Sequence, residues 1–423
     1  MSGSGQPPLI IIIGGAIAGA ESARFFADLG ATVIVIEQNQ RPYGKVEDGL
    51  PRWHLKLQQK HIREIDDHLS LPTVHLVPRT QVGADIRLDQ IQTWQPDAVI
   101  FASGAWRDRP LSIPGVERHL GKRFCYQNRF VYWFNHYLDQ AYDGDQVDIQ
   151  DHALVVGGGL ASIDVVKILQ IELARKAFKE RGISYTSPAL EHGNGLRAAL
   201  DQHRLTLTDL GLTGATLIYR KPAEELPLAP IPPTATEAER LKRKQVSLKL
   251  LSLAQQKFLF RFLPAHLPVG LLEENDQLVG LKLMPTSAHG EPLPGAASVD
   301  VRSRLIISSI GSIPHPIEGL TLNGERYRLS DGETCQAAGF ENVYLVGNAV
   351  TGKGNIITSQ RHARMVCEKI LARLQNRIRG GAKIELALAK IRERQREVGY
   401  PGDYRTYRDM VRWQNPDAGT MHG

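Results

Sequence analysis

The feature that most constrains this 423-residue chain is a stretch near its N-terminus, residues 9–38. Its first five residues are apolar, which is typical of a buried parallel strand, and Gly14 and Gly15 follow directly. An alanine-rich segment then predicts a helix over residues 17–29, and residues 32–36 predict a second strand. A strand, a helix and a second strand in this order predict a βαβ unit of a parallel sheet.

The turn between the first strand and the helix carries a dinucleotide-binding pattern, GxAxxG. Gly14 permits a tight turn, Gly19 lets the helix pack closely on the strand, and the helix N-terminus can face a pyrophosphate. Glu37 ends the second strand, 23 residues after Gly14, where an acid accepts hydrogen bonds from ribose hydroxyls. Ala16 stands in place of the usual second glycine, so the phosphate approach must tolerate a methyl group. A turn without a ligand is the alternative, but the complete strand, helix, strand and acid favour a bound dinucleotide.

Residues 152–170 repeat this pattern with an apolar strand, a GxGxxS motif and a helix. Gly157 and Gly159 take the positions of the first two glycines, and Ser162 takes the position of the third. A small side chain there opens the helix–strand packing only slightly. A long insertion, residues 171–213, follows and is predicted to be helical at its start.

The strand that closes this second unit, residues 215–219, ends in Arg220 and Lys221, where the first unit ends in Glu37. An acid suits a free 2′-hydroxyl group, whereas bases suit a 2′-phosphate. The contrast predicts FAD at the first unit and NADPH at the second. An exposed strand end, where basic residues are common, is the alternative for Arg220 and Lys221.

A third informative stretch covers residues 343–365. A predicted strand runs into Gly347 and Asn348, a glycine loop with Gly354 follows, and a helix begins at about Ile356. Gly354 lets the backbone approach a flat group, and the positive end of the new helix faces that group. A plain strand–loop–helix crossover is the alternative, and the two nucleotide units upstream favour a flavin contact.

Composition limits the other classes of function. The net charge of +6 comes without a basic run interleaved with aromatics, so nucleic-acid binding is less favoured than a solvated face or a docking site for an acidic partner. Cys125, Cys335 and Cys367 lie far apart and form no CxxC, so we expect a reducing, cytoplasmic compartment and no redox disulfide, iron–sulfur or zinc site. The N-terminal apolar run has no preceding basic residue and ends at two glycines, which indicates a strand rather than a signal peptide or membrane span.

The predicted architecture is α/β, with two Rossmann-like dinucleotide-binding domains, the NADPH domain being inserted into the FAD domain. Residues 1–150 and 315–423 are assigned to FAD and residues 151–314 to NAD(P)H, and a Pro-rich segment at 107–117 indicates a domain edge. Two helices are predicted besides those of the glycine motifs, a helix at 57–69 and a charged helix at 383–399, and a capping box of Thr236 and Glu239 opens a further, basic helix. Strands are predicted at 97–101 and, as a small antiparallel layer, at 278–284 and 298–310. Residues 224–233 are predicted to be irregular.

Together these residues resemble the two-dinucleotide-binding flavoprotein family. Within it they are most similar to adrenodoxin reductase-type ferredoxin–NADP reductases, and next to the small subunit of glutamate synthase. The resemblance spans roughly residues 9–370 and rests on IIGGAIAGAESA with Glu37, PYGKVEDGLPRWH, ASG…RPLSIPG, VVGGGLASIDVVK, IYRK, SSIGSIPHP and VGN…GKGNI. It implies that FAD contacts Gly14, Gly15, Ala16, Ile17, Ala18, Gly19, Glu37, Gln38, Gly44, Lys45, Val46, Gly104, Gly347, Asn348, Gly354, Asn355 and Ile356. It implies that NADPH contacts Gly157, Gly159, Leu160, Ala161, Arg220 and Lys221.

The resemblance also implies an activity, an oxidoreductase that passes hydride from NADPH to flavin N5 and then electrons to a separate acceptor. A ferredoxin-like one-electron carrier is the favoured acceptor, steered by basic residues at 240–244 and 392–396. The alternatives are a subunit that supplies electrons to a partner enzyme, a quinone or small-molecule reductase, and a redox-inert nucleotide sensor. No acid–base residue is strictly required. His54, in a PRWH segment similar to a PDH segment of the family, is a candidate for tuning the flavin site or a simple packing residue.

This sequence departs from the family pattern at two places. Asn348 stands where many members carry an Asp that reaches the flavin ribityl chain. Arg220 and Lys221 replace an arginine pair at the phosphate-binding strand, so the preference for NADPH over NADH rests on a less typical pair.

Overall fold

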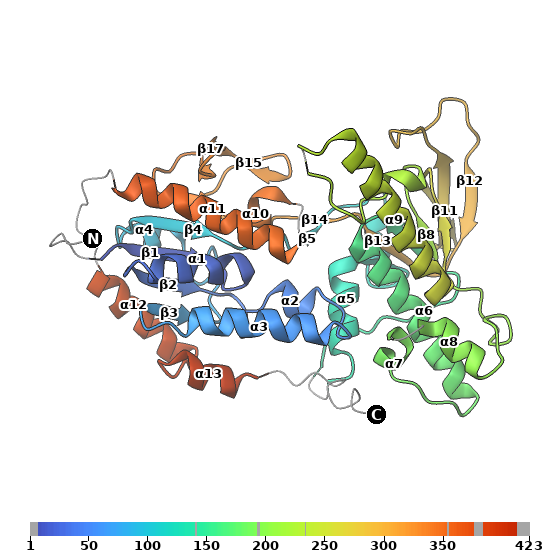
Figure 1. Ribbon diagram of the computed structural model, residues 1–423, viewed down its shortest axis with the longest axis horizontal. Helices are drawn as coiled ribbons and strands as arrows, with labels where there is room; N and C mark the ends of the chain where they lie inside the picture. The colour runs from blue at the N-terminus through green and yellow to red at the C-terminus, as the bar shows by residue number, and fades with distance from the viewer. Residues whose placement is uncertain are drawn as a thin grey trace. The chain divides into compact units, whose positions relative to one another are not determined.

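The computed structural model describes residues 7–139, 142–192, 195–232, 234–352, 355–375 and 384–412 (Figure 1). The chain divides into two compact units. Among the described residues, unit 1 comprises residues 7–50, 54–107 and 312–412, and unit 2 comprises Pro51–Trp53 and Asp108–Gly311. Along the chain, unit 2 is therefore inserted into unit 1.

Unit 1 is built on a seven-stranded sheet with the order β17-β18-β19-β4-β1-β2-β3. The strands from β19 to β3 are parallel, and β17 and β18 add an antiparallel edge. The predicted βαβ unit is present, because β1 and β2 pair in parallel, with Leu9 opposite Thr32 and Ile13 opposite Ile36. The strands of this sheet are β1 Leu9–Ile13, β2 Thr32–Ile36, β3 Val74–Val77, β4 Ala98–Phe101, β17 Leu329–Asp331, β18 Gln336–Ala337 and β19 Val343–Leu345.

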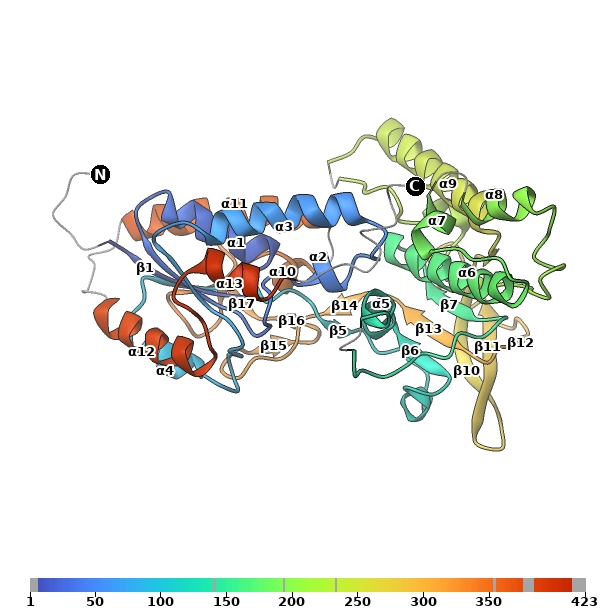
Figure 2. The same ribbon diagram turned by 90° about the horizontal axis from the view of Figure 1, so that it is seen from below.

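Helices cover both faces of this sheet. Alternate residues of a strand point to opposite faces, and the central strands are apolar on both, so each face must be buried. Ile10 and Ile12 face one core with α1, α3 and α11, while Ile11 and Ile13 face another with α4 and α12. Figure 2 shows these two groups of helices on opposite sides of the sheet. The helices of unit 1 are α1 Ile17–Ala27, α2 Lys45–Asp48, α3 Leu55–Leu69, α4 Leu88–Gln92, α10 Asn348–Thr351, α11 Ile356–Gln375, α12 Ile384–Glu397 and α13 Tyr404–Met410. Unit 1 also has a small hairpin, β15 Leu322–Asn323 and β16 Arg326–Tyr327. Two short strands, β5 Arg107–Asp108 and β14 Ser312–Ile313, lie where the chain passes between the two units.

Unit 2 contains a five-stranded parallel sheet with the order β6-β13-β7-β8-β9 and a three-stranded antiparallel sheet with the order β10-β11-β12. Val155 and Leu217 face a helical core, whereas Leu154 and Val156 face side chains of β11, so the second sheet takes the place of one helical layer. The strands are β6 Phe124–Tyr126, β7 Leu154–Gly157, β8 Thr216–Ile218, β9 Arg261–Leu263, β10 His266–Glu274, β11 Gln277–Pro285, β12 Val299–Arg302 and β13 Ile306–Ser309. The helices are α5 Gln127–His136, α6 Leu160–Glu180, α7 Ser187–Glu191, α8 Gly195–Gln202 and α9 Glu237–Phe258, with 3₁₀ turns η1 Val116–His119 and η2 Ala223–Glu225.

The structure differs from the sequence predictions at two places in this unit. Residues 298–310, predicted as part of the antiparallel layer, form two strands in different sheets, because β12 pairs with β11 whereas β13 pairs with β6 and β7. The main segment of unit 2 begins at Asp108, inside the Pro-rich segment, rather than near residue 150. The reason is that β6 completes the parallel sheet beside β13 and α5 packs on α6 and β13.

The capping box predicted for α9 is present, with Thr236 and Glu239 each accepting from the other's backbone N–H. Within the described residues, no helix is both long enough and apolar enough to span a bilayer.

Candidate functional site

The turn between β1 and α1 leaves no room for side chains at its two outer glycines. A Cβ built on Gly14, whose φ is +99°, would lie 2.8 Å from the carbonyl oxygen of Ala102. A Cβ on Gly19 would lie 1.8 Å from the carbonyl oxygen of Gly14. Helix α1 therefore rests directly on the turn, which is the packing that the third glycine of the fingerprint predicts.

Glu37 is fixed at the end of β2 by two backbone N–H groups. Its Oε2 accepts from the N–H of Gly15 at 2.8 Å, and its Oε1 accepts from the N–H of Asn39 at 2.8 Å. The side chain is 5% exposed, and this burial raises the pKa of the carboxyl group, whereas the two hydrogen bonds lower it. Because each carboxylate oxygen has a second acceptor position, the group can still accept from ribose hydroxyls.

The N-terminus of α1 is open to an anionic group. Ala16 is the N-cap, with φ −74° and ψ −161°, an extended conformation that an alanine adopts without strain. Alanine has no side-chain acceptor, so it does not cap the first N–H groups of the helix. Uncapped N–H groups and the positive end of a helix dipole can attract an anion, and the predicted contacts of Ile17 and Ala18 with a cofactor stay predictions.

Other segments of unit 1 meet this helix end. A Cβ on Gly44 would lie 3.0 Å from the Cβ of Ala16, and a Cβ on Gly347 would lie 2.9 Å from the Cβ of Ala18. Both glycines have positive φ, +51° and +62°. Gly104, with φ +69°, follows the segment that contacts Gly14. The structure thus brings together predicted site residues from distant parts of the sequence.

The loop after β2 carries the predicted residues Gln38, Lys45 and Val46. Gln38 is exposed and Val46 is buried. The Lys45 Nζ donates to Ser312 Oγ at 3.1 Å and lies 5.4 Å from the ring centroid of Trp106. No comparison tests the cofactor contacts of these residues, so they stay predictions.

Asn348 lies at the first position of α10, directly after Gly347. Its Oδ1 accepts from Thr351 Oγ1 at 3.1 Å and from Ser359 Oγ at 3.4 Å, so the side chain is held between α10 and α11. An Asp at this position could accept the same two bonds, so the exchange of Asp for Asn leaves these local contacts in place.

The start of α11 is capped by Asn355. Its Oδ1 accepts from the backbone N–H of Thr358 at 2.9 Å, the pattern of an N-cap residue, and Ile356 is the first helical residue. Gly354 lies outside the described residues.

His54 immediately precedes α3 and is half-buried, and its carbonyl accepts from the N–H of Gln58 at 2.9 Å. Its suggested role in tuning the flavin site stays a prediction.

The second glycine motif, in unit 2, uses a serine where the first uses a glycine. A Cβ on Gly157 would lie 2.3 Å from the carbonyl oxygen of Ser309 and 2.4 Å from Ser162 Oγ. Ser162 Oγ donates to that same carbonyl at 3.0 Å. The helix α6 is therefore tied to the end of β13 by a side-chain hydrogen bond rather than by direct backbone contact.

The N-terminus of α6 is exposed. Gly159 is its N-cap, and the next two residues, Leu160 and Ala161, are exposed, with Leu160 52% exposed. A Cβ on Gly158 would lie 2.3 Å from the ring of Tyr219, whose hydroxyl donates to the carbonyl of Glu225 at 2.7 Å. The sequence analysis missed this tyrosine, which lies against the motif from the end of β8.

Arg220 and Lys221 follow Tyr219 on a backbone that the antiparallel layer holds in place. The carbonyl of Arg220 accepts from Thr286 Oγ1 at 2.6 Å, and the carbonyl of Lys221 accepts from the N–H of Ala265 at 2.9 Å. The Arg220 side chain is exposed and the Lys221 side chain is half-buried. The main chain at both bases is thus fixed, and their predicted contact with a 2′-phosphate stays a prediction.

The C-terminal helix α13 holds the loop that leads from Glu37 to Gly44, a role that the sequence did not reveal. Tyr407 donates its hydroxyl to the carbonyl of Gln40 at 2.9 Å. The hydroxyls of Tyr404 and Tyr43 both donate to Asp66 Oδ1, at 2.7 and 3.0 Å. Tyr407 and Gln40 are 367 positions apart, so no local pattern points to the contact.

The cysteines are all free and buried. Burial raises the pKa of Cys125 and of Cys367 to about 12, and it also raises the pKa of Cys335. Such thiols stay protonated at neutral pH and are poor nucleophiles.

The chain is similar to several known proteins. Residues 8–176 match the family model described as pyridine nucleotide-disulphide oxidoreductase. The subunit beta of an NADPH-Fe(3+) oxidoreductase from Geobacter sulfurreducens is 25% identical over 317 residues, which cover 72% of this chain and 37% of that protein. The mitochondrial NADPH:adrenodoxin oxidoreductase of Arabidopsis thaliana is 28% identical over 173 residues, 40% of this chain and 32% of that protein.

A solved structure, Mycobacterium tuberculosis FprA in complex with NADPH, superposes with a TM-score of 0.68 at 18% identity, covering 93% of this chain and 91% of that one. This confirms the predicted α/β fold class, and the relatives confirm the predicted resemblance to adrenodoxin reductase-type proteins. The aligned part of the chain spans about a third of the length of the curated relatives it matches.

Proposed function

We propose that this chain is an FAD-dependent NADPH oxidoreductase that passes electrons to a separate acceptor. Its residues 8–176 match the family model of the pyridine nucleotide-disulphide oxidoreductases. The observation that carries the proposal is the buried carboxylate of Glu37, held by the Gly15 and Asn39 N–H groups beside a turn that admits no side chain at Gly14 or Gly19. A buried carboxylate with acceptor positions left over, beside a turn that admits no side chain, supports a dinucleotide that approaches the backbone closely at this point.

FAD and NADPH are the cofactors expected for this family. When bound, they supply the chemistry, which is hydride transfer from the nicotinamide to the flavin. In our proposal the N–H groups at the start of α1 hold the FAD pyrophosphate, and Glu37 accepts from its ribose hydroxyls. Arg220 and Lys221 donate to the 2′-phosphate of NADPH, next to the open N-terminus of α6.

The purified protein tests this proposal directly. We expect a yellow protein with one FAD per chain, whose flavin absorbance is bleached within a turnover time when NADPH is mixed with it in a stopped-flow instrument. A protein that binds both nucleotides without bleaching is a nucleotide sensor, and a protein that takes up no added FAD is not a flavoprotein. Either result overturns the proposal.

As acceptor we propose an acidic one-electron carrier of the ferredoxin type. The name of the Arabidopsis relative, NADPH:adrenodoxin oxidoreductase, supports such a partner, and so does the net charge of +6. Part of the basic charge is already neutralised, because Lys244 pairs with Glu225 at 2.5 Å and Arg394 pairs with Asp85 at 2.9 Å. The electrostatic attraction of an acidic carrier is therefore weaker than the number of basic residues alone indicates.

A salt series separates this acceptor from a small molecule. The Debye length falls from about 10 Å at 0.1 M salt to about 3 Å at 1 M, so steering of an acidic carrier weakens as salt rises. We expect reduction of a ferredoxin to slow steeply with salt, and reduction of a neutral quinone to stay nearly constant. Turnover with quinone alone, or ferredoxin turnover that does not respond to salt, contradicts the ferredoxin proposal.

A second candidate is an electron-supply subunit for a partner enzyme. The Geobacter relative is named as a subunit, and its similarity covers 72% of this chain. Isolation of the tagged chain from its native cells at low salt tests this candidate. A partner protein recovered at a fixed molar ratio, which also accelerates NADPH oxidation, supports it, whereas an isolated active chain contradicts it.

A further inference from the structure

The turn that carries Gly347 and Asn348 is held by a histidine of α11. The backbone N–H of Gly347 donates to Nδ1 of His362 at 3.0 Å. A ring nitrogen that accepts carries no proton, so the single proton of the neutral imidazole is on Nε2. That nitrogen lies 3.7 Å from Sγ of Cys335, a distance at which sulfur accepts an N–H bond.

Cys335 is itself fixed. It adopts a left-handed conformation with φ +54°, its carbonyl accepts from the N–H of Leu345 at 2.9 Å, and its Sγ lies 3.6 Å from the carbonyl of Gly332. A left-handed residue that is not glycine persists only where its surroundings hold it. The thiol therefore offers a fixed sulfur to the imidazole.

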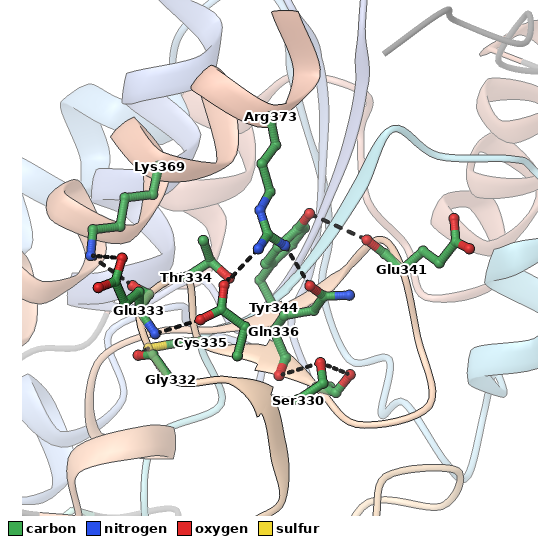
Figure 3. A network of polar contacts seen from close by, with 12 residues as sticks. Ser330, Gly332, Glu333, Thr334, Cys335, Gln336, Glu341, Tyr344, Lys369 and Arg373 are labelled. Atoms are coloured by element: carbon green, nitrogen blue, oxygen red, sulfur yellow. Dashed lines mark hydrogen bonds and ion pairs between the residues drawn. The ribbon is translucent and has the colours of Figure 1, made fainter. Parts of the chain in front are cut away.

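Two cationic side chains of α11 donate hydrogen bonds to the turn that contains Cys335 (Figure 3). Arg373 donates to Asp331 Oδ2 at 2.6 Å and to Gln336 Oε1, and Lys369 Nζ donates to the carbonyl of Glu333 at 3.0 Å. Positions 362, 369 and 373 are seven and eleven residues apart, which places them on one face of the helix. These contacts therefore set His362 at a defined height and rotation opposite Cys335.

We propose that His362 is a positioning residue for the flavin loop, its neutral imidazole accepting the N–H of Gly347 and so holding the Gly347–Asn348 turn against α1. The observation that this turn contacts α1 is independent, because a Cβ on Gly347 would lie 2.9 Å from the Cβ of Ala18. The inference rests on the proposed FAD binding at this turn, and it goes beyond it by naming the group that keeps the turn in place.

A pH dependence follows from the geometry. Protonation of Nδ1 removes the acceptor of the Gly347 N–H. Burial alone lowers the pKa of His362 from its ordinary value of 6.5. The titratable group that faces His362 is the thiol of Cys335. Burial raises the pKa of this thiol, which Asp331 raises further and Lys369 lowers, so the thiol is neutral.

The direction of the pKa shift of His362 decides whether acid weakens or strengthens the turn. A histidine whose pKa is lower in the folded protein stabilises it fully above 6.5, and this contribution is lost as pH falls below that value. We therefore expect FAD affinity to be constant above about pH 7 and to decrease as the pH falls below 6.5.

Two substitutions of the same histidine test the proposal. In His362→Asn, Oδ1 is the same number of bonds from Cα as Nδ1 and can accept the Gly347 N–H. In His362→Gln, the amide reaches the position of Nε2 instead. We expect His362→Gln to weaken FAD binding roughly tenfold at pH 7.5, the effect of one hydrogen bond, and His362→Asn to bind nearly as the wild type does but without the acid-side decrease.

Amide hydrogen exchange in the FAD-free protein makes the test independent of the cofactor. A peptide that covers residues 343–352 should exchange faster in His362→Gln than in the wild type, while His362→Asn should protect it. The matched control is Cys335→Ser, which keeps a hydrogen-bond acceptor opposite Nε2 and should preserve protection.

The outcomes separate the two proposals. A wild type that takes up no FAD overturns the proposed function, yet its exchange data still report on His362. Uptake of FAD by the wild type together with unchanged exchange and affinity in His362→Gln overturns the positioning role. If His362→Gln fails to fold, His362→Asn decides, because an FAD affinity with the same dependence on pH in His362→Asn as in the wild type contradicts the inference.

Discussion

The two glycine motifs of this molecule share a plan and differ at the residues that close it. In unit 1, Gly19 brings α1 within direct contact of the turn, and the second strand ends in the buried Glu37. In unit 2, Ser162 ties α6 to β13 through a hydrogen bond, and the second strand ends in the exposed Arg220.

The difference teaches how one fold can serve two kinds of ligand. A buried acid that already accepts two backbone hydrogen bonds is organised before a ligand arrives, which suits a group that stays bound. Exposed bases at an open helix N-terminus attract an anion quickly and release it as readily, which suits a group that exchanges at each turnover. The predictions below test this comparison, from the largest expected effect to the smallest.

The largest effect is expected from exchanging the two strand-end charges. Glu37→Arg places a buried cation opposite the N–H groups of Gly15 and Asn39, which costs about 3–5 kcal/mol and removes the acceptors of the ribose. The variant should be purified without FAD and should unfold at a lower temperature. The reverse exchange, Arg220→Glu, alters an exposed position and should leave FAD content and thermal unfolding unchanged.

Absorbance of the purified variants and their thermal unfolding curves provide the measurement. Retention of one FAD per chain by Glu37→Arg would falsify the assignment of the first unit. Loss of FAD from Arg220→Glu would show that the two motifs do not act separately.

The next effect compares the residues at the third position of each motif. Gly19→Ala forces a Cβ to 1.8 Å from a backbone oxygen, which only a shift of α1 can relieve, so we expect a loss of about 3 kcal/mol, the upper end for overpacking. Ser162→Ala loses one side-chain hydrogen bond and should cost about 1 kcal/mol. Urea midpoints of the FAD-free proteins measure both. Equal midpoints for the two variants would contradict the view that the first motif is the tighter one.

The parts of the fold that the sequence predicted are those with a strong local pattern. The strand of five apolar residues at β1, the alanine-rich α1 and the capping box of α9 all lie close to where their patterns place them. Strand β10 was missed, because Pro268 and Gly270 interrupt its alternation and a bulge shifts its register. The start of the main segment of unit 2 at Asp108 follows from pairing between β6 and β13, which are separated by about 180 positions in the chain.

The site divides in the same way. Gly14, Gly19 and Glu37 stand within one βαβ unit, so spacing alone predicts that they meet. His362 and Tyr407 contact the loops of the site from helices that follow much later in the chain. A lone histidine or tyrosine in a helix carries no signal of such a contact, because the contact depends on how distant elements pack.

A smaller effect is expected from removing the bases of the second motif. Each charge-assisted bond to a 2′-phosphate is worth about 1.5–3 kcal/mol, and exposure favours the lower end, so Arg220→Ala and Lys221→Ala should each raise KM for NADPH about tenfold. The values of kcat and of KM for NADH should stay nearly constant, since NADH lacks the phosphate. Steady-state kinetics with both nucleotides measure this. A double variant that keeps the wild-type preference for NADPH would place the phosphate site elsewhere.

The smallest effect comes from two tyrosine hydroxyls that make the same bond in different units. Tyr407 donates to the carbonyl of Gln40 behind Glu37, and Tyr219 donates to the carbonyl of Glu225 beside Arg220. Each substitution by Phe removes one neutral hydrogen bond, worth about 0.5–1.5 kcal/mol, or roughly a two- to tenfold change in an affinity. We expect Tyr407→Phe to weaken FAD binding and to leave KM for NADPH unchanged. We expect Tyr219→Phe to raise KM for NADPH and to leave FAD binding unchanged. Titration with FAD and kinetics with NADPH form a two-by-two comparison, in which each variant is the control of the other. Because the bonds match in chemistry, a crossed result, with Tyr407→Phe raising KM for NADPH, would mean that the loops of the two motifs are coupled rather than independent.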